Sequence, residues 1–146
     1  FDRDYGSGLH DFIHFKYVLL LMNQAYVFDS GHQTIADLDT GTNELSVDNY
    51  QRLELAGKRI ETSNGKTRWK IDVNPTWTNL GQDAILDSII LAQAESGDDA
   101  TSPLCGQIYG DETTKDRLPI LLIGTTTFEF IPNEEGLWTF TLGGGA

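Results

Sequence analysis

The stretch Lys58-Arg59-Ile60-Glu61-Thr62-Ser63-Asn64-Gly65-Lys66-Thr67-Arg68-Trp69-Lys70-Ile71-Asp72-Val73 decides the fold class of this chain. Its centre, Asn64-Gly65, is typical of a type I′ turn, which needs a positive φ at both central residues and joins two antiparallel strands. We therefore predict a hairpin with arms at Lys58–Ser63 and Lys66–Val73. In the second arm, period-two alternation predicts core positions at Trp69, Ile71 and Val73 and solvent positions at Lys66, Arg68 and Lys70.

Short strands are predicted on both sides of this hairpin. The apolar run Ile13–Met22 loses its alternation after Val18, which indicates a strand buried on both faces. The run has about half of the roughly 20 apolar residues that a membrane span needs, so we predict that it does not cross a membrane. Thr34–Leu38 makes one helical turn at most. The remaining predicted strands are Arg52–Leu55, Thr76–Thr78, Leu104–Tyr109, Pro119–Ile123, Thr125–Ile131 and Leu137–Leu142.

Residues 83–94 fit two descriptions. Asp83 has the side chain of a helix cap, and the pairs Ile85/Ile89 and Leu86/Ile90 have helical spacing. A strand over Leu86–Gln93 fits the surrounding strands better. We prefer the strand and keep the helix as the alternative.

These elements predict an all-β fold, a single-domain antiparallel β-sandwich or jelly roll with an extended N-terminal arm. The length of 146 residues fits one domain. Gly6-Ser7-Gly8 predicts an arm over residues 1–11, with a frayed terminus as the alternative. The β-sandwich domain then covers residues 12–142, and a flexible C-terminal tail covers residues 143–146. Because the chain begins at Phe1 instead of Met, we expect processing or an upstream start, and no signal-peptide pattern is visible.

The charge is unevenly distributed. The 22 acidic and 10 basic residues give a net charge of −12, which argues against a nucleic-acid partner. Six of the basic residues lie between Arg52 and Lys70, whereas Ile71 to Thr114 contains none and has eight acidic residues. A basic hairpin beside an acidic half would allow copies to meet by opposite faces. A solvated hairpin face is the plain alternative.

Two patterns resemble metal sites only faintly. Asp37, Asp39, Gly41 and Glu44 have some calcium-loop character, but the glycine comes one place too early, so a turn is the default interpretation. His10 and His14, four residues apart, would converge only on a helix. We predict no metal site and no cofactor.

Catalytic signatures are equally weak. The single cysteine, Cys105, has the context of a small strand residue, and it excludes an internal disulfide. The acidic pairs lie in predicted loops, where solvation gives their pKa values no reason to rise. Trp69 and Trp138 fall on core positions, which leaves Trp77 as the one tryptophan for stacking on a sugar. We predict that the protein is not an enzyme. The acidic pairs are Asp98-Asp99, Asp111-Glu112 and Glu134-Glu135.

Several segments occur in the order found in a family of small tailed-phage virion proteins, which the chain resembles over Phe12–Leu142. The most specific pieces are Asn43–Ser46 and Gly97–Leu104, and the chain departs from the pattern at Asn23–Gly31 and Asp111–Arg117. The full set is Ile13–Leu21, Tyr26–Asp39, Thr42–Ser46, Tyr50–Leu55, Thr76–Leu80, Ser88–Gln93, Gly97–Leu104 and Trp138–Leu142.

The resemblance implies a non-enzymatic bacteriophage virion structural protein. We expect a capsid decoration (cement) protein that stabilises the assembled head, located on the capsid surface of the virion. A tail, fibre-base or baseplate module that contacts a receptor is the alternative, and a carbohydrate-binding jelly roll is the remote one. The expected partners are the major capsid protein or other virion proteins and further copies of the chain, with no nucleic acid and no membrane. We expect the partner contacts at Phe1, Tyr5, Phe12, Lys66, Arg68 and Lys70.

Overall fold

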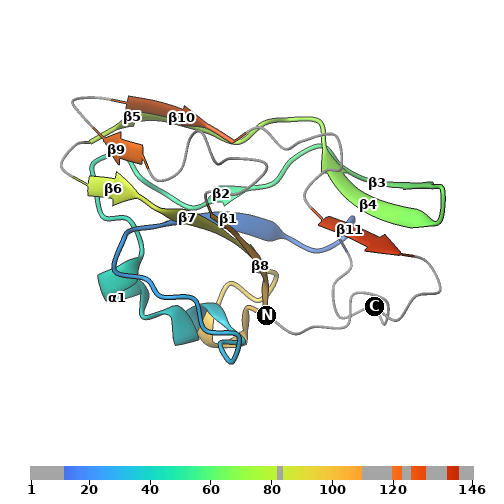
Figure 1. Ribbon diagram of the computed structural model, residues 1–146, viewed down its shortest axis with the longest axis horizontal. Coiled ribbons are helices and arrows are strands. Elements are labelled where there is room, and N and C mark those ends of the chain that lie inside the picture. The colour runs from blue at the N-terminus through green and yellow to red at the C-terminus, as the bar shows by residue number, and fades with distance from the viewer. Residues whose placement is uncertain (1–11, 82–83, 110–119, 123–125, 131–137, 142–146) are drawn as a thin grey trace.

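The computed structural model describes residues 12–81, 84–109, 120–122, 126–130 and 138–141. These residues form mainly antiparallel strands, so the fold is all-β, as predicted (Figure 1). Three short helical turns, η1 (Ile35–Leu38), α1 (Thr40–Asn43) and η2 (Asp99–Thr101), complete it. The strands are β1 (Tyr17–Met22), β2 (Leu53–Glu54), β3 (Lys58–Ser63), β4 (Lys66–Ile71), β5 (Thr76–Leu80), β6 (Ala84–Leu86), β7 (Ser88–Gln93), β8 (Leu104–Tyr109), β9 (Ile120–Leu122), β10 (Thr126–Glu129) and β11 (Trp138–Thr141).

The central sheet has the strand order β2-β1-β7-β8. Strand β1 pairs with β7 from Tyr17↔Gln93 to Met22↔Ser88, and all of its residues are buried. This confirms the predicted burial on both faces. The strand begins at Tyr17 instead of Ile13, because the chain turns at residues 12–15 and carries Phe12 back onto the core.

Burial on both faces follows from two apolar clusters that the central sheet separates. Because side chains alternate along a strand, β1 contributes to both clusters. Its odd-numbered residues join the cluster under β4, β5 and β10, and its even-numbered residues join the cluster that η1 covers (Figure 1). The first cluster includes Tyr17, Leu19, Leu21, Trp69, Trp77 and Phe128, and the second includes Val18, Leu20, Met22, Ile35, Leu38 and Ile90.

Residues 84–93, for which the sequence allows a strand or a helix, form two strands, so the helix alternative is wrong. Strand β6 pairs with β9, and β7 lies between β1 and β8. Asp87 separates the two strands and donates its backbone N–H to Met22 O at 2.9 Å. Every residue of β7 is buried, and a sheet position satisfies its backbone groups on both sides.

The hairpin has the predicted turn. Asn64 and Gly65 have φ values of 51° and 75°, and β3 pairs with β4 in an unbroken register. The second arm is shorter than predicted, because the chain bends after Asp72, whose N–H makes the last cross-strand bond to Gly57 O. Val73 is 55% exposed, so the predicted core position there is wrong.

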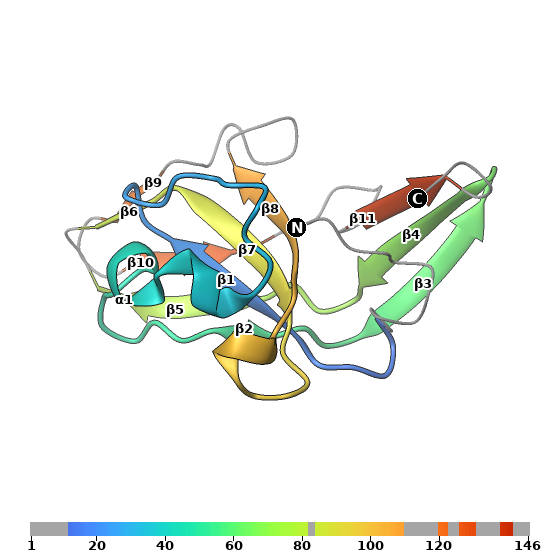
Figure 2. The ribbon, with the colours of Figure 1, turned by 90° about the horizontal axis from the view of Figure 1, so that it is seen from below.

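The three-stranded sheet β11-β4-β3 extends away from the sheet that contains β1 and β7 (Figures 1 and 2). The remaining sheets are the pairs β5–β10 and β6–β9, which lie above the central sheet in Figure 1. None of the helices in the described part of the chain has the length and apolar character needed to cross a membrane.

Candidate functional site

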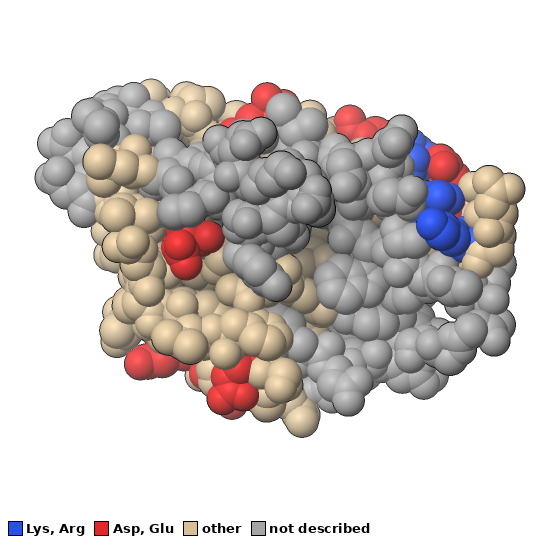
Figure 3. All heavy atoms as spheres, in the orientation of Figure 1, with Lys and Arg blue, Asp and Glu red and all other residues tan. Residues whose placement is uncertain are grey.

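The strongest candidate surface is one face of the β3–β4 hairpin, which we call the charged hairpin face. The register Arg59↔Lys70, Glu61↔Arg68 and Ser63↔Lys66 brings charged side chains of both strands onto this face. Its residues are Arg59, Glu61, Ser63, Lys66, Arg68, Lys70 and Asp72. In the view of Figure 3, the blue Lys and Arg atoms gather at this end of the molecule, whereas the charged atoms visible on the described surface elsewhere are red.

The charges on this face are partly paired. Arg59 donates to Glu61 and to Asp72 at 2.8 Å each, and Lys70 lies 3.2 Å from Glu61. The Arg59 guanidinium, followed by the Lys70 ammonium, holds the pKa of Glu61 below its ordinary value. Arg68 donates to Ser63 Oγ at 3.0 Å, and Lys66 is exposed. The three predicted solvent positions lie on the face opposite Trp69, but only Lys66 is exposed, and Arg68 and Lys70 are half-buried. The face carries both acidic and basic side chains.

An aromatic cluster anchors the base of the hairpin. The Phe12 ring stacks on Trp69 with a centroid distance of 4.5 Å, and Tyr17 meets Trp69 edge-on at 5.5 Å. The Lys58 ammonium lies over both smaller rings, 5.8 Å from the Phe12 centroid and 5.5 Å from the Tyr17 centroid. It also donates to the Phe15 carbonyl. These contacts fix the hairpin against β1.

The anchor corrects one expected partner contact. Phe12 is 1% exposed, so its ring belongs to the core and is not offered to a partner. The sequence placed Phe12 next to the arm and did not show that the following turn folds it back onto Trp69. Phe1 and Tyr5 lie outside the described residues, and their role stays a prediction. The structure thus leaves Lys66, Arg68 and Lys70 together on the charged hairpin face.

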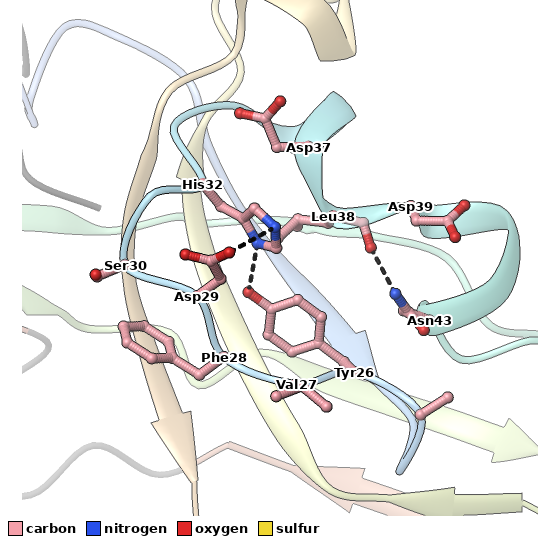
Figure 4. Close-up of a pocket in the computed structure, with 11 residues that line it drawn as sticks. Tyr26, Val27, Phe28, Asp29, Ser30, His32, Asp37, Leu38, Asp39 and Asn43 are labelled. Carbon is pink, nitrogen blue, oxygen red and sulfur yellow. Dashed lines mark hydrogen bonds and ion pairs between the residues drawn. The ribbon is translucent and has the colours of Figure 1, made fainter.

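An open hollow of about 610 Å³ lies on the side of the central sheet that η1 covers (Figure 4). Tyr26 Oη is 3.2 Å from His32 Nδ1, and His32 Nε2 is 3.8 Å from Asp29. Burial raises the pKa of Tyr26. Val27 and Phe28 are exposed at the rim, with 77% and 50% of their surface accessible.

This hollow does not assemble a nucleophile with a base among the residues that the structure describes. Figure 4 shows the Ser30 hydroxyl pointing away from His32. Asp37 accepts the Gln33 and Thr34 N–H groups at 2.8 and 3.0 Å, and these two donors, Gln33 first, lower its pKa. The carboxylate therefore closes a turn, which agrees with the default interpretation of the segment that resembles a calcium loop. No group of three or more metal-ligating side chains occurs in the described ranges.

An ion-pair cluster that the sequence did not reveal joins Glu44, Tyr50 and Arg52 to the distant Asp99. Arg52 donates to both oxygens of Glu44 at 2.9 and 3.0 Å and to both oxygens of Asp99 at 2.8 and 3.2 Å. Tyr50 donates to Glu44 and accepts the Leu21 N–H at 3.1 Å. Burial, followed by the Glu44 charge, raises the pKa of Tyr50 well above its ordinary value. The expected solvation of Asp99 is only partly correct, because its side chain is 41% exposed and also accepts from Arg52.

The candidate for sugar stacking is wrong. Trp77 is 2% exposed, its indole N–H donates to Gln51 O at 2.7 Å, and its ring packs at 5.8 Å from Phe128. Trp69 is buried as predicted, and Cys105 is a fully buried strand residue. The described His14 is exposed in the turn before β1, and His10 lies outside the described residues.

No protein-family model, no curated protein and no solved structure matches this chain. The resemblance to small tailed-phage virion proteins therefore stays a prediction from the sequence segments quoted above.

Proposed function

We propose that the protein is a non-enzymatic structural protein of a bacteriophage virion, a capsid decoration protein that stabilises the assembled head. The order of the resembling segments supports this proposal, and so does the all-β fold. We further infer that the domain is a β-sandwich, in which the β5–β10 and β6–β9 sheets cover one face of the central sheet. Its partners in this proposal are the major capsid protein and further copies of the chain.

The observation that carries the proposal is the geometry of the charged hairpin face. The β3–β4 hairpin extends from the body (Figure 2). The Phe12–Trp69 stack holds its base. Ordering the hairpin on binding therefore costs little conformational entropy, because the free protein already has it ordered. Its basic side chains, Arg59, Lys66, Arg68 and Lys70, suit an acidic surface on the shell.

Decoration would act by mass action. A protein that binds only the assembled shell stabilises it by RT ln(1 + [L]/Kd), which is about 2.7 kcal/mol per site at a hundredfold excess over Kd. This mechanism needs a rigid docking surface and no reactive group. The burial of Trp77 removes the feature on which the carbohydrate-binding alternative rested.

The test is a binding experiment on capsids that lack the protein. We expect the purified chain to saturate the capsid lattice and to raise the temperature at which the shell opens. The double variant K66E/R68E should reduce occupancy at least about tenfold, because it reverses two charges at the docking face. K16E is the matched control, since Lys16 is exposed but lies off the hairpin. Equal occupancy of the two variants would contradict the assignment of the face.

A deletion within the N-terminal arm provides a second test. Deleting residues 1–8 should weaken capsid binding and leave the melting temperature of the isolated domain unchanged. Unchanged occupancy after this deletion would remove the arm from the proposal. Binding of a few copies at one vertex, instead of a lattice of copies, would support the tail or baseplate alternative.

A further inference from the structure

The open hollow of about 610 Å³ has an acidic lining (Figure 4). The carboxylates of Asp29, Asp37 and Asp39 contribute to it. The described lining residues fall within residues 17–51, a stretch with five acidic residues and no lysine or arginine. Coulombic attraction therefore favours a cationic side chain in this space, which we call the acidic hollow.

The rim of the acidic hollow is apolar and exposed. Val27 and Phe28 are neighbours in the chain, and 77% and 50% of their surface is accessible. A partner that covers them removes apolar surface from water, which favours association. The adjoining wall is fixed by the contact of 3.2 Å between Tyr26 Oη and His32 Nδ1. Because the space already exists in the free protein, filling it costs little conformational entropy.

A cation suited to this space lies at the tip of the β3–β4 hairpin. Lys66 directly follows the two-residue turn Asn64-Gly65, and all three residues are exposed. The pairing of β3 with β4 behind the turn is unbroken. The tip is therefore a narrow, ordered projection that presents a positive charge together with small turn residues.

We propose that the hairpin tip, Ser63–Lys66, docks in the acidic hollow of a second copy of this chain. The Lys66 ammonium then lies among the carboxylates of the hollow, and the turn residues cover Val27 at the rim. This inference rests on the proposed function only in taking the charged hairpin face as a docking surface, and it names the partner of that face. On a decorated shell, the acidic hollow of a neighbouring copy is an acidic surface that the face can meet.

Charge and position make this contact heterologous. Two acidic hollows that faced each other would set carboxylates against carboxylates, so the contact joins unlike surfaces. In Figures 1 and 2, the hairpin tip lies at one end of the molecule, whereas α1, which contributes Asn43 to the hollow, lies toward the other. Each copy can therefore use both surfaces at once. Assembly continues past the dimer, as a ring where the rotation closes and as a chain where it does not.

The contact is small, because a four-residue tip enters one hollow. Contacts below about 1,200 Å² belong to weak, transient complexes. We therefore expect a dissociation constant of about 10–100 µM for one contact between isolated chains.

The test uses the purified chain alone, by sedimentation velocity from about 5 µM to 1 mM, a range set around that constant. The native chain should form species larger than a dimer as the concentration rises. K66E reverses the charge of the tip, and V27K/D39N makes the hollow less acidic by two charges. Asparagine suits position 39, where φ is 53°. Each variant alone should associate at least about tenfold more weakly than the native chain.

A mixture of the two variants tests the geometry of the contact. K66E retains a native hollow and V27K/D39N retains a native hairpin, so one native contact can form between them. An equal mixture should therefore give dimers with about the native constant, and these dimers should not grow further. The isologous alternative predicts no recovery on mixing.

Matched controls carry the same charge changes at exposed positions outside the hollow and the tip. V73K/D48N and K16E should assemble like the native chain, since Val73, Asp48 and Lys16 are exposed and lie elsewhere. Circular dichroism melting checks the fold of each variant. A monomeric native chain at about 1 mM, or a mixture that stays monomeric or grows past dimers, would overturn the inference.

The outcomes also separate this inference from the proposed function. A chain that assembles in solution but does not bind capsids would refute the proposed function alone. Capsid binding by a chain that stays monomeric at about 1 mM would refute the inference alone.

Discussion

Removing the Arg52 side chain should destabilise the fold far more than removing Arg59, a surface arginine that also pairs with two carboxylates. The Arg52 side chain is 30% exposed, and its partner Glu44 is only 11% exposed. The variant R52A would leave the Glu44 carboxylate nearly buried, with the Tyr50 hydroxyl as its remaining side-chain donor among those described. The Asp99 carboxylate, 41% exposed, would regain water.

The magnitude follows from these exposures. Removing one partner of a buried ion pair costs about 3–5 kcal/mol. An exposed pair contributes about 0.2–1 kcal/mol. Because Arg52 and Asp99 are both partly exposed, we expect R52A to cost about 2–3 kcal/mol, most of it from Glu44. In a domain of this size, the melting temperature should fall by roughly 6–10 °C.

Arg59 provides the matched control. It also contacts two carboxylates, Glu61 and Asp72, at 2.8 Å each, but it lies on the exposed hairpin face. R59A should leave the melting temperature nearly unchanged. The assay is thermal unfolding followed by circular dichroism.

A double-mutant cycle isolates the cause. The variant E44Q removes the charge that R52A would strand, so R52A should cost clearly less in the E44Q background than in the native chain. If R52A and R59A lower the melting temperature equally, or if E44Q does not reduce the cost of R52A, the reasoning is refuted.

Three further outcomes are expected from the same packing. The raised pKa of Tyr50 keeps it protonated in the folded state, so its contribution is complete below about pH 10, the ordinary tyrosine pKa, and is lost as the pH rises beyond it. In pH-dependent unfolding, Y50F should therefore show a shallower loss of stability above that pH, and an unchanged slope would contradict it. A Cβ at Gly81 would lie 2.9 Å from a backbone nitrogen, whereas one at Gly41 would meet nothing within 4 Å. G81A should lower the denaturant midpoint and G41A should not; equal midpoints would be evidence against the close approach. F12A should cost about 3–5 kcal/mol because the ring is fully buried, while I13A, at a 40% exposed position, should cost under about 0.5 kcal/mol in chemical denaturation; similar costs would contradict the folded-back turn.

The sequence predicted the elements whose signals are local. Asn64-Gly65 located the hairpin turn because both positions need a positive φ, and the strand Leu104–Tyr109 was predicted with the bounds that the structure has. The lost alternation in β1 indicated burial on both faces, and the two clusters explain why. The preference for strand over helix is correct for residues 84–93, although the sequence did not predict the break at Asp87.

The misses have a common physical origin in tertiary contacts. Trp77 alternates with threonines, so its strand pattern did not show which face is covered, and the covering ring, Phe128, is distant in sequence. The pairing of Arg52 with Glu44 and Asp99 likewise has no local signature. The sequence places Phe12 beside the predicted arm, which suggests a partner contact. The turn that folds its ring onto the core depends on Trp69, which is distant in the sequence.

The most direct test of the proposed function is the copy number of this chain in the virion that carries it, measured by quantitative mass spectrometry against the major capsid protein. The proposal predicts a fixed ratio with many copies, spread over the capsid lattice, and a ratio that falls when K66E/R68E replaces the native chain. A handful of copies per virion, or none, would contradict it.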